Sequence, residues 1–191
     1  MKLNDIRDVA VIGSGVIGYS WALSFAMNGH KVHVYDVKDD ALKLAKSRIH
    51  DSLENLASNK VLNPNKIEKI ENRISYTTSI ENAVKNTKFI VESGPEKYEV
   101  KWSIVNDVEK YASEDAIITS STSGLLITEI AKNAKHPERF IGAHPYNPPH
   151  LIPLVEITKG EKTKDENVQL AYDLYKSIKK EPVILQKEAL G

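Results

Sequence analysis

Close to its amino terminus the chain reads Val9-Ala10-Val11-Ile12-Gly13-Ser14-Gly15-Val16-Ile17-Gly18. The first four of these residues are apolar, which predicts a short strand buried on both faces of a sheet. The glycines follow with the spacing G-x-G-x-x-G, and residues 16–28 then carry one apolar stripe at helical spacing. A strand, a glycine turn and a helix in this order predict the first unit of a doubly wound sheet.

The same alternation continues along the chain. Apolar runs predict further strands at 32–36, 89–91, 116–119, 140–141, 154–158 and 183–185. Helices are expected from an N-cap at Asp39, from Pro64, from Pro95, over 128–133 and over 165–179. We therefore expect an α/β fold with one doubly wound, mostly parallel sheet covered by helices, formed as a single domain over 1–191. Residues 39–73 are expected to form a helical excursion that stands off the sheet.

Composition narrows the classes of protein. Of the 191 residues, 41% are apolar and 27% are charged, which excludes a disordered chain and a coiled coil. Basic and acidic residues number 26 each, and this balance argues against a general binder of nucleic acid or of anionic membranes. The absence of cysteine excludes a disulfide scaffold, a thiolate nucleophile and a zinc ribbon. With neither a signal-peptide core nor a membrane-length apolar stretch, a cytoplasmic protein is expected.

The glycine turn has the surroundings of a dinucleotide site. Asp36 ends the second predicted strand, 23 positions after Gly13. Gly13 permits the turn, Gly15 lets the backbone approach a pyrophosphate, and Gly18 lets the helix lie close to the strand. Asp36 would accept hydrogen bonds from the adenine ribose and repel a 2′-phosphate, which favours NAD over NADP despite the nearby Lys38. FAD satisfies the same fingerprint, so the cofactor stays open at this point.

A second unusual stretch runs from Gly142 to Glu156. Its four prolines, between positions 145 and 153, favour a rigid and extended path. His144 precedes this loop and Glu156 lies in the strand after it. Histidine suits a general base near neutral pH, and a neighbouring carboxylate would fix its tautomer. The residues alone do not show whether the two meet, and a metal-dependent hydrolase using His144, His150 and Glu156 as ligands is an alternative.

Taken together, these motifs resemble the L-3-hydroxyacyl-CoA dehydrogenase family. The resemblance covers essentially the whole chain and rests on the glycine turn with Asp36, Ser121-Thr122-Ser123-Gly124-Leu125-Leu126, and His144-Pro145-Tyr146-Asn147-Pro148 followed by Leu154-Val155-Glu156. Within the family, 120–123, Pro148-Pro149, 160–163 and 186–191 are similar to the branch of lambda-crystallin (L-gulonate 3-dehydrogenase) and the carnitine 3-dehydrogenases. Members that use CoA often carry Asn at the position of Ser121, which disfavours a CoA thioester here.

The resemblance implies an NAD-dependent oxidoreductase that converts the 3-hydroxyl of a 3-hydroxy acid, or of its CoA ester, to a ketone. His144 would be the general base, Glu156 would orient it, and Ser123 would hydrogen-bond the reacting oxygen. The implied contacts with the cofactor are Gly13, Gly15, Val16, Ile17, Gly18, Asp36, Glu92, Lys97, Ser121 and Asn147. No metal is expected, and a non-catalytic NAD-binding or structural protein is a further alternative.

The end of the chain carries its own expectation. Gly191 comes shortly after the predicted strand at 183–185, and the resemblance implies that a Phe, an active-site Asn and a helical domain for dimerisation and substrate binding follow it. We therefore expect a small-molecule substrate and a homodimer for the full-length protein. Residues 1–191 alone are expected to bind NAD but to turn over poorly. An exposed apolar patch is expected near 140–160 and 183–191, where the second domain would pack.

Overall fold

Eight strands form one sheet in the computed structural model, which describes residues 1–188. In order across the sheet they are β3 (Ile74–Thr77), β2 (Lys31–Tyr35), β1 (Asp8–Ile12), β4 (Phe89–Glu92), β5 (Ile117–Ser120), β6 (Phe140–Pro145), β7 (Leu154–Lys159) and β8 (Glu181–Ile184). All neighbouring strands run parallel except β6 and β7, which are antiparallel. The expected doubly wound, mostly parallel sheet of the Rossmann type is confirmed.

Helices cover both faces of the sheet, because successive residues of each central strand point to opposite sides. Val9 and Val11 of β1 pack in the core with α1 (Val16–Met27), α2 (Asp39–Ser58), α3 (Ile67–Glu71) and α7 (Asp165–Ser177). Ala10 and Ile12 pack on the other side with α4 (Ile80–Val84), α5 (Tyr98–Tyr111) and α6 (Ile127–Ile130). The sheet is therefore buried between two helical layers, which explains its nearly continuous apolar runs.

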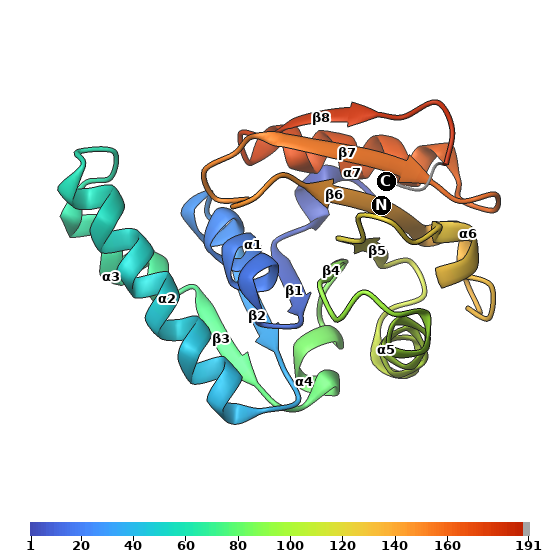
Figure 1. Ribbon diagram of the computed structural model, residues 1–191, viewed down its shortest axis with the longest axis horizontal. Coiled ribbons are helices and arrows are strands. Elements are labelled where there is room, and N and C mark those ends of the chain that lie inside the picture. Colours follow the sequence, from blue (N-terminus) through green and yellow to red (C-terminus); the bar gives the residue numbers. More distant parts are fainter. Residues whose placement is uncertain (189–191) are drawn as a thin grey trace.

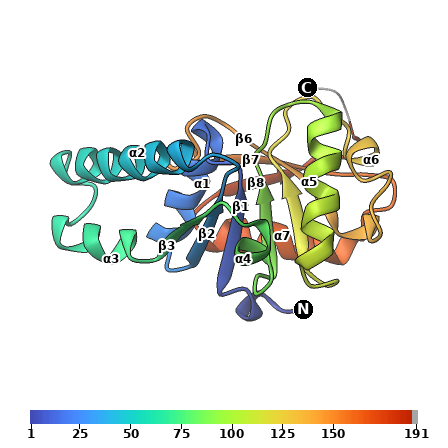
Figure 2. The ribbon, with the colours of Figure 1, turned by 90° about the horizontal axis from the view of Figure 1, so that it is seen from below.

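The predicted excursion at 39–73 is a helical hairpin. Helices α2 and α3 run side by side and project from the end of the molecule at which β3 lies (Figures 1 and 2). The residues of α2 that face inward are the predicted ones, Leu42, Ala45, Ile49, Leu53 and Leu56. Along this stretch the polar residues face solvent, which is why its composition is so rich in Lys and Asn.

Three boundaries differ from the prediction. The N-cap of α2 is Lys38 rather than Asp39, which is already helical and pairs with Lys43 at 2.7 Å. Pro64 opens a 3-10 turn, Pro64–Lys66, that leads into α3. Helix α5 begins at Tyr98 instead of Pro95, because the intervening residues form a loop against the site described below. Strand β3 and helix α4 were not predicted at all.

The carboxyl ends of β1, β2, β4 and β5 lie at one edge of the sheet, since these strands are parallel. This edge carries the glycine turn after β1, Asp36 after β2, Glu92 at the end of β4 and Ser121 after β5. Within residues 1–188, no helix combines the length and apolar character needed to cross a membrane.

Candidate active site

The three glycines of the turn after β1 have different surroundings. Gly13 has φ +98°, and a Cβ placed on it would lie 2.6 Å from the Ser93 carbonyl oxygen of the β4–α5 loop. A Cβ on Gly18 would collide with the Gly13 carbonyl, which shows how closely α1 approaches the turn. Around Gly15, the N-cap of α1, a Cβ would meet nothing within 4 Å. Gly13 and Gly18 are therefore required by packing, whereas Gly15 faces open space.

This open space fits the pyrophosphate of a dinucleotide. Gly15 and Val16 are exposed, and the N–H groups of the first helical turn have no partner inside the helix. These groups and the positive end of the α1 dipole suit an anion. The expected residues Gly13, Gly15, Val16, Ile17 and Gly18 lie together at the start of α1, where Gly15 and Val16 are exposed and Gly18 is buried.

Asp36, which follows β2, holds the glycine turn after β1 in place by hydrogen bonds. Its Oδ2 accepts from the Ser14 backbone N–H at 2.9 Å and from the Ser14 hydroxyl at 2.8 Å, and its Oδ1 accepts from the Lys38 N–H at 3.2 Å. A carboxylate has about four acceptor positions, so a ribose hydroxyl can still bind beside these three donors. Asp36 therefore has a structural contact that the sequence did not reveal, in addition to its predicted place beside the cofactor.

His144 and Glu156 meet across the antiparallel pair β6–β7. They are directly opposite in the register, and His144 Nδ1 lies 3.0 Å from Glu156 Oε2. About a third of each side chain is exposed, so the pair lies at a surface that small molecules can reach. When Nδ1–H donates to the carboxylate, Nε2 of the neutral ring is left as a proton acceptor. Tyr146 also contacts Glu156, because its hydroxyl donates to Oε1 at 3.2 Å.

A pocket of about 260 Å³ lies beside this pair. It collects predicted residues from distant parts of the chain: Ile17, Ser121, Ser123, His144 and Asn147. Ser121 is held in place by the Trp21 indole N–H, at 3.1 Å, and by the Ser93 hydroxyl, at 3.0 Å. The start of α1, the loop after β5 and His144 therefore line one cavity.

Glu96 is a pocket residue that the sequence analysis did not identify. Its Oε1 accepts from the Thr122 hydroxyl at 2.5 Å and from the N–H groups of Ser123 and Gly124 at 2.9 and 3.1 Å. Partial burial acts to raise the pKa of Glu96, but these hydrogen bonds and the Lys101 ammonium outweigh it and lower the pKa. Glu96 therefore stays ionised and fixes the loop that carries Ser123.

Of the ten predicted cofactor contacts, Ile17, Ser121 and Asn147 line this pocket, and Glu92 and Lys97 are among the seven that do not. Glu92 is 2% exposed, and its carboxylate binds the Lys101 ammonium at 2.8 Å, the Ser120 hydroxyl at 2.5 Å and the Gly94 N–H at 2.6 Å. Lys97 is the exposed N-cap of α5. Glu92 thus supports the pocket wall from inside, and its predicted contact and that of Lys97 with the cofactor stay predictions.

His150 contacts α1 and makes no hydrogen bond with His144 or Glu156. Its Nδ1 lies 2.6 Å from the Ser20 hydroxyl of α1, and burial followed by the charge of Lys180 lowers its pKa. The metal-ligand set of His144, His150 and Glu156 is therefore not assembled. Residues 1–188 contain no group of three or more His, Asp or Glu side chains arranged to hold a metal ion.

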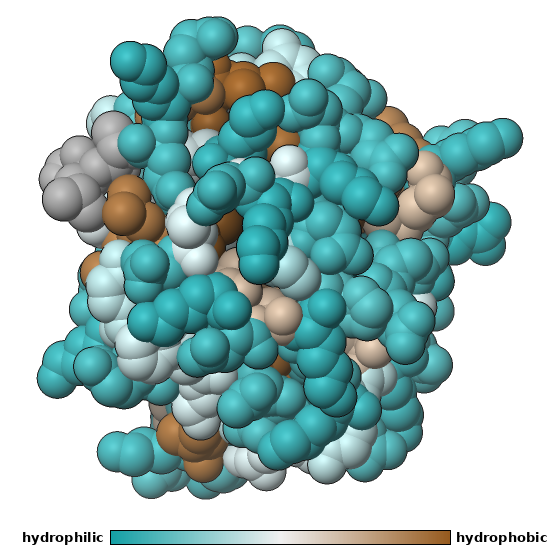
Figure 3. All heavy atoms as spheres, turned by 90° about the vertical axis from the view of Figure 1, so that its right-hand side faces the viewer, coloured by the Kyte–Doolittle hydropathy of each residue, from teal (hydrophilic) through white to brown (hydrophobic). Residues whose placement is uncertain are grey.

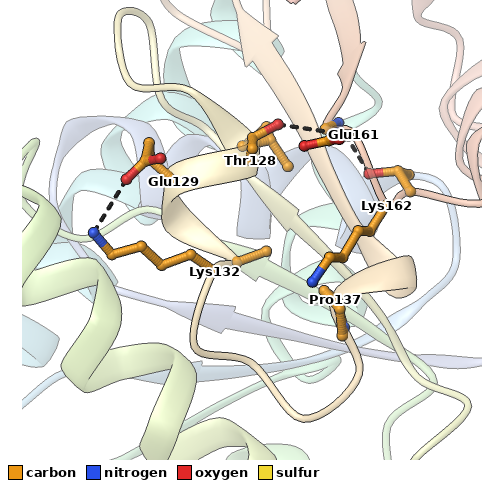
Figure 4. A pocket seen from close by; sticks show the side chains of 10 residues that line it. Thr128, Glu129, Lys132, Pro137, Glu161 and Lys162 are labelled. Atoms are coloured by element: carbon orange, nitrogen blue, oxygen red, sulfur yellow. Dashed lines mark hydrogen bonds and ion pairs between the residues drawn. The ribbon is translucent and has the colours of Figure 1, made fainter.

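A second pocket, of about 180 Å³, lies between α6 and the loop after β7 (Figure 4). Lysines and glutamates line its mouth, with Lys132 paired to Glu129 at 3.1 Å and Thr128 accepting from the Glu161 N–H at 2.9 Å. None of the predicted site residues lines it. The surrounding face is mainly hydrophilic, with small separate hydrophobic areas (Figure 3).

Large apolar side chains are exposed in both segments where a patch was expected. They are Tyr146, Leu151, Ile152, Val183 and Ile184, all at least 36% exposed. The last three residues of the expected patch, 189–191, lie outside the described residues. What covers these side chains is not tested, so the packing of a second domain there stays a prediction.

Comparison with known proteins identifies the family of the chain. Residues 8–189 match the family described as 3-hydroxyacyl-CoA dehydrogenase, NAD binding domain. The L-carnitine dehydrogenase of Oceanobacillus iheyensis is 38% identical over 97% of this chain and 59% of that protein. A 3-hydroxyacyl-CoA dehydrogenase of Gibberella moniliformis is 34% identical over 98% of this chain and 57% of its own length.

A crystal structure of another protein has the same fold. The (S)-3-hydroxybutyryl-CoA dehydrogenase from Ralstonia eutropha has a TM-score of 0.93 at 30% identity, over 96% of this chain and 64% of that one. The chain spans about three fifths of the length of the two relatives named above. Since the family match covers nearly every described residue, the chain belongs to the 3-hydroxyacyl-CoA dehydrogenase family, whose NAD-binding domain it forms.

Proposed function

We propose that the full-length protein containing this chain is an NAD-dependent dehydrogenase that oxidises the 3-hydroxyl of a small 3-hydroxy acid to a ketone. The observation that carries the proposal is the contact of His144 with Glu156 beside a pocket that begins at the dinucleotide helix. NAD, when bound, supplies the acceptor for the hydride that leaves C3.

The residues of the chain divide the remaining work. His144 accepts the proton of the substrate hydroxyl at Nε2, because Nδ1 is engaged by Glu156. Glu156 holds the ring and stabilises the imidazolium that forms. Ser123 hydrogen-bonds the reacting oxygen from across the pocket, on a loop that Glu96 holds rigid.

Within the family we infer the carnitine type of substrate. Ser121 stands where members that act on CoA thioesters often carry Asn, and the relative named L-carnitine dehydrogenase is 38% identical. Carnitine, L-gulonate and a 3-hydroxyacyl-CoA share the reacting CH–OH group and differ in what surrounds it. We also propose that a second domain, beyond this chain, completes the substrate site and the dimer.

The test follows NADH absorbance with the full-length protein. L-Carnitine, 3-hydroxybutyryl-CoA and L-gulonate are compared at matched concentrations, and L-carnitine is expected to give the highest kcat/KM. Preference for the CoA ester would refute the carnitine assignment while keeping a dehydrogenase. Tight NADH binding with no turnover of any 3-hydroxy acid would instead support the non-catalytic alternative.

A further inference from the structure

We propose that Tyr146 is a positioning residue that keeps the Glu156 carboxylate against His144. The proposal deepens the proposed function and rests on it for the catalytic consequence, although the contact itself does not. Tyr146 lies inside the His144-Pro145-Tyr146-Asn147-Pro148 motif, but the sequence analysis assigned it no role in the site.

The register of β6 and β7 brings the three side chains together. His144 and Tyr146 are two residues apart, so they lie on the same face of the strand. The Tyr146 N–H donates to the Leu154 carbonyl at 3.3 Å, which continues the strand pairing one step beyond β6. Glu156 is therefore directly opposite His144 and diagonal to Tyr146, and both positions are within side-chain reach.

Glu156 needs a second contact to stay in place. Its side chain is 30% exposed, and a carboxylate held through one oxygen can rotate away into water. Oε2 accepts from His144, while Oε1 accepts from the Tyr146 hydroxyl. The two rings also pack, with centroids 5.5 Å apart at an angle of 45°. Tyr146 thus binds the second carboxylate oxygen of Glu156 while its ring packs beside the imidazole.

The charges around the contact keep the hydroxyl a donor. The negative charge of Glu156, and then its hydrogen bond, raise the pKa of Tyr146, so the phenol stays protonated at any pH at which the dehydrogenase would operate. The other titratable group that lines the pocket is Glu96, from the β4–α5 loop, with Lys101 of α5 at 3.4 Å behind it. These groups are unchanged by a substitution at Tyr146, so a change in the titration of the pair reports on Tyr146.

The experiment compares Tyr146→Phe with Tyr111→Phe in the full-length protein. Tyr111 is similarly exposed, at 44% against 42%, and is the last residue of α5, about 20 Å along that helix from the pocket end. Tyr146→Phe is expected to lower kcat about 3- to 10-fold, the range for one net hydrogen bond, with the KM for NAD unchanged. Tyr111→Phe is expected to leave both parameters at the wild-type values.

A pH profile separates positioning from a general structural effect. When Glu156 spends less time on His144, the imidazolium loses support, so the acidic limb of kcat/KM moves to lower pH. NMR titration of the His144 ring is expected to show the same downward movement, in the direction given by Glu156→Gln but smaller. An unchanged or upward-moving midpoint in Tyr146→Phe would overturn the proposal. A downward movement in a protein that turns over no 3-hydroxy acid would support the positioning role and refute the proposed function.

Discussion

Alanine substitutions at two glycines of the same turn are expected to affect different properties of the protein. Gly18→Ala should lower its stability, and Gly15→Ala should lower its affinity for NADH. Gly18→Ala places its methyl against the Gly13 carbonyl, which is backbone and cannot rotate aside. Gly15→Ala places its methyl where nothing lies within 4 Å, in a backbone conformation, φ −63° and ψ −166°, that L-residues adopt readily. The first substitution therefore tests packing and the second tests the cofactor surface.

The structure gives the size of each effect. Overpacking costs up to about 3 kcal/mol, and replacing glycine inside a helix returns about 1 kcal/mol, so Gly18→Ala should lose about 2 kcal/mol. For 191 residues that would lower the melting temperature by about 4–8 °C, and the longer full-length protein should show a smaller shift of a few degrees, because its unfolding entropy is larger. Gly15→Ala should change stability by less than about 1 kcal/mol, since alanine is only a poorer N-cap than glycine. Its methyl stands where the pyrophosphate would approach, so NADH affinity should fall about tenfold or more.

Thermal melts and NADH titration of the full-length variants check both numbers. The separation of the two effects is the critical result, because a generally damaged domain would lose stability and affinity together. Wild-type NADH affinity in Gly15→Ala would refute the position of the pyrophosphate on this turn. A wild-type melting temperature in Gly18→Ala would show that α1 does not approach the turn as closely as described.

Three further predictions concern the catalytic histidine and two buried lysines. His144→Ala should lower turnover about 10²–10⁴-fold and leave NADH affinity unchanged, which steady-state kinetics and titration measure side by side. Lys101→Met leaves the buried Glu92 carboxylate without its cation and should lower the free energy of unfolding in urea by about 3 kcal/mol or more. Adding Glu92→Gln to this variant should restore part of the loss. Burial lowers the pKa of Lys180 to about 8 from 10.5, so between these pH values the unfolded chain binds more protons than the folded one. Wild type should therefore gain stability relative to Lys180→Met as the pH rises from 7 to 10, by at most about 3 kcal/mol in paired urea melts.

The central strands were predictable because burial on both faces leaves a continuous apolar run, as in Val9–Ile12. Strand β3 lies at the edge of the sheet, and only Ile74 of its four residues is buried. Helix α4 has five residues, too few for a helical period to appear in the sequence. An edge strand and a one-turn helix have weak hydrophobic patterns in the sequence for the same reason, because few of their side chains are buried in the core.

The parts of the candidate site that lie within one local motif could be predicted from the sequence. Contacts that depend on the register of two strands could not. His144 and Glu156 are twelve residues apart, and their contact exists only because β6 and β7 pair antiparallel with these two residues opposite. The proline-rich loop between them gives no sign of this register.

Charged residues are the harder case, because a lysine on a helix is normally expected to face solvent. Lys101 is 1% exposed, and its ammonium contacts Glu92 at 2.8 Å and Glu96 at 3.4 Å. The two carboxylates lie four residues apart, at the end of β4 and in the loop that precedes the start of α5 at Tyr98. One buried cation thus holds both the wall of the pocket, through Glu92, and the Ser123 loop, through Glu96. Since burying a charge is costly unless it is paired, this triad fixes the pocket geometry more strictly than apolar packing would require.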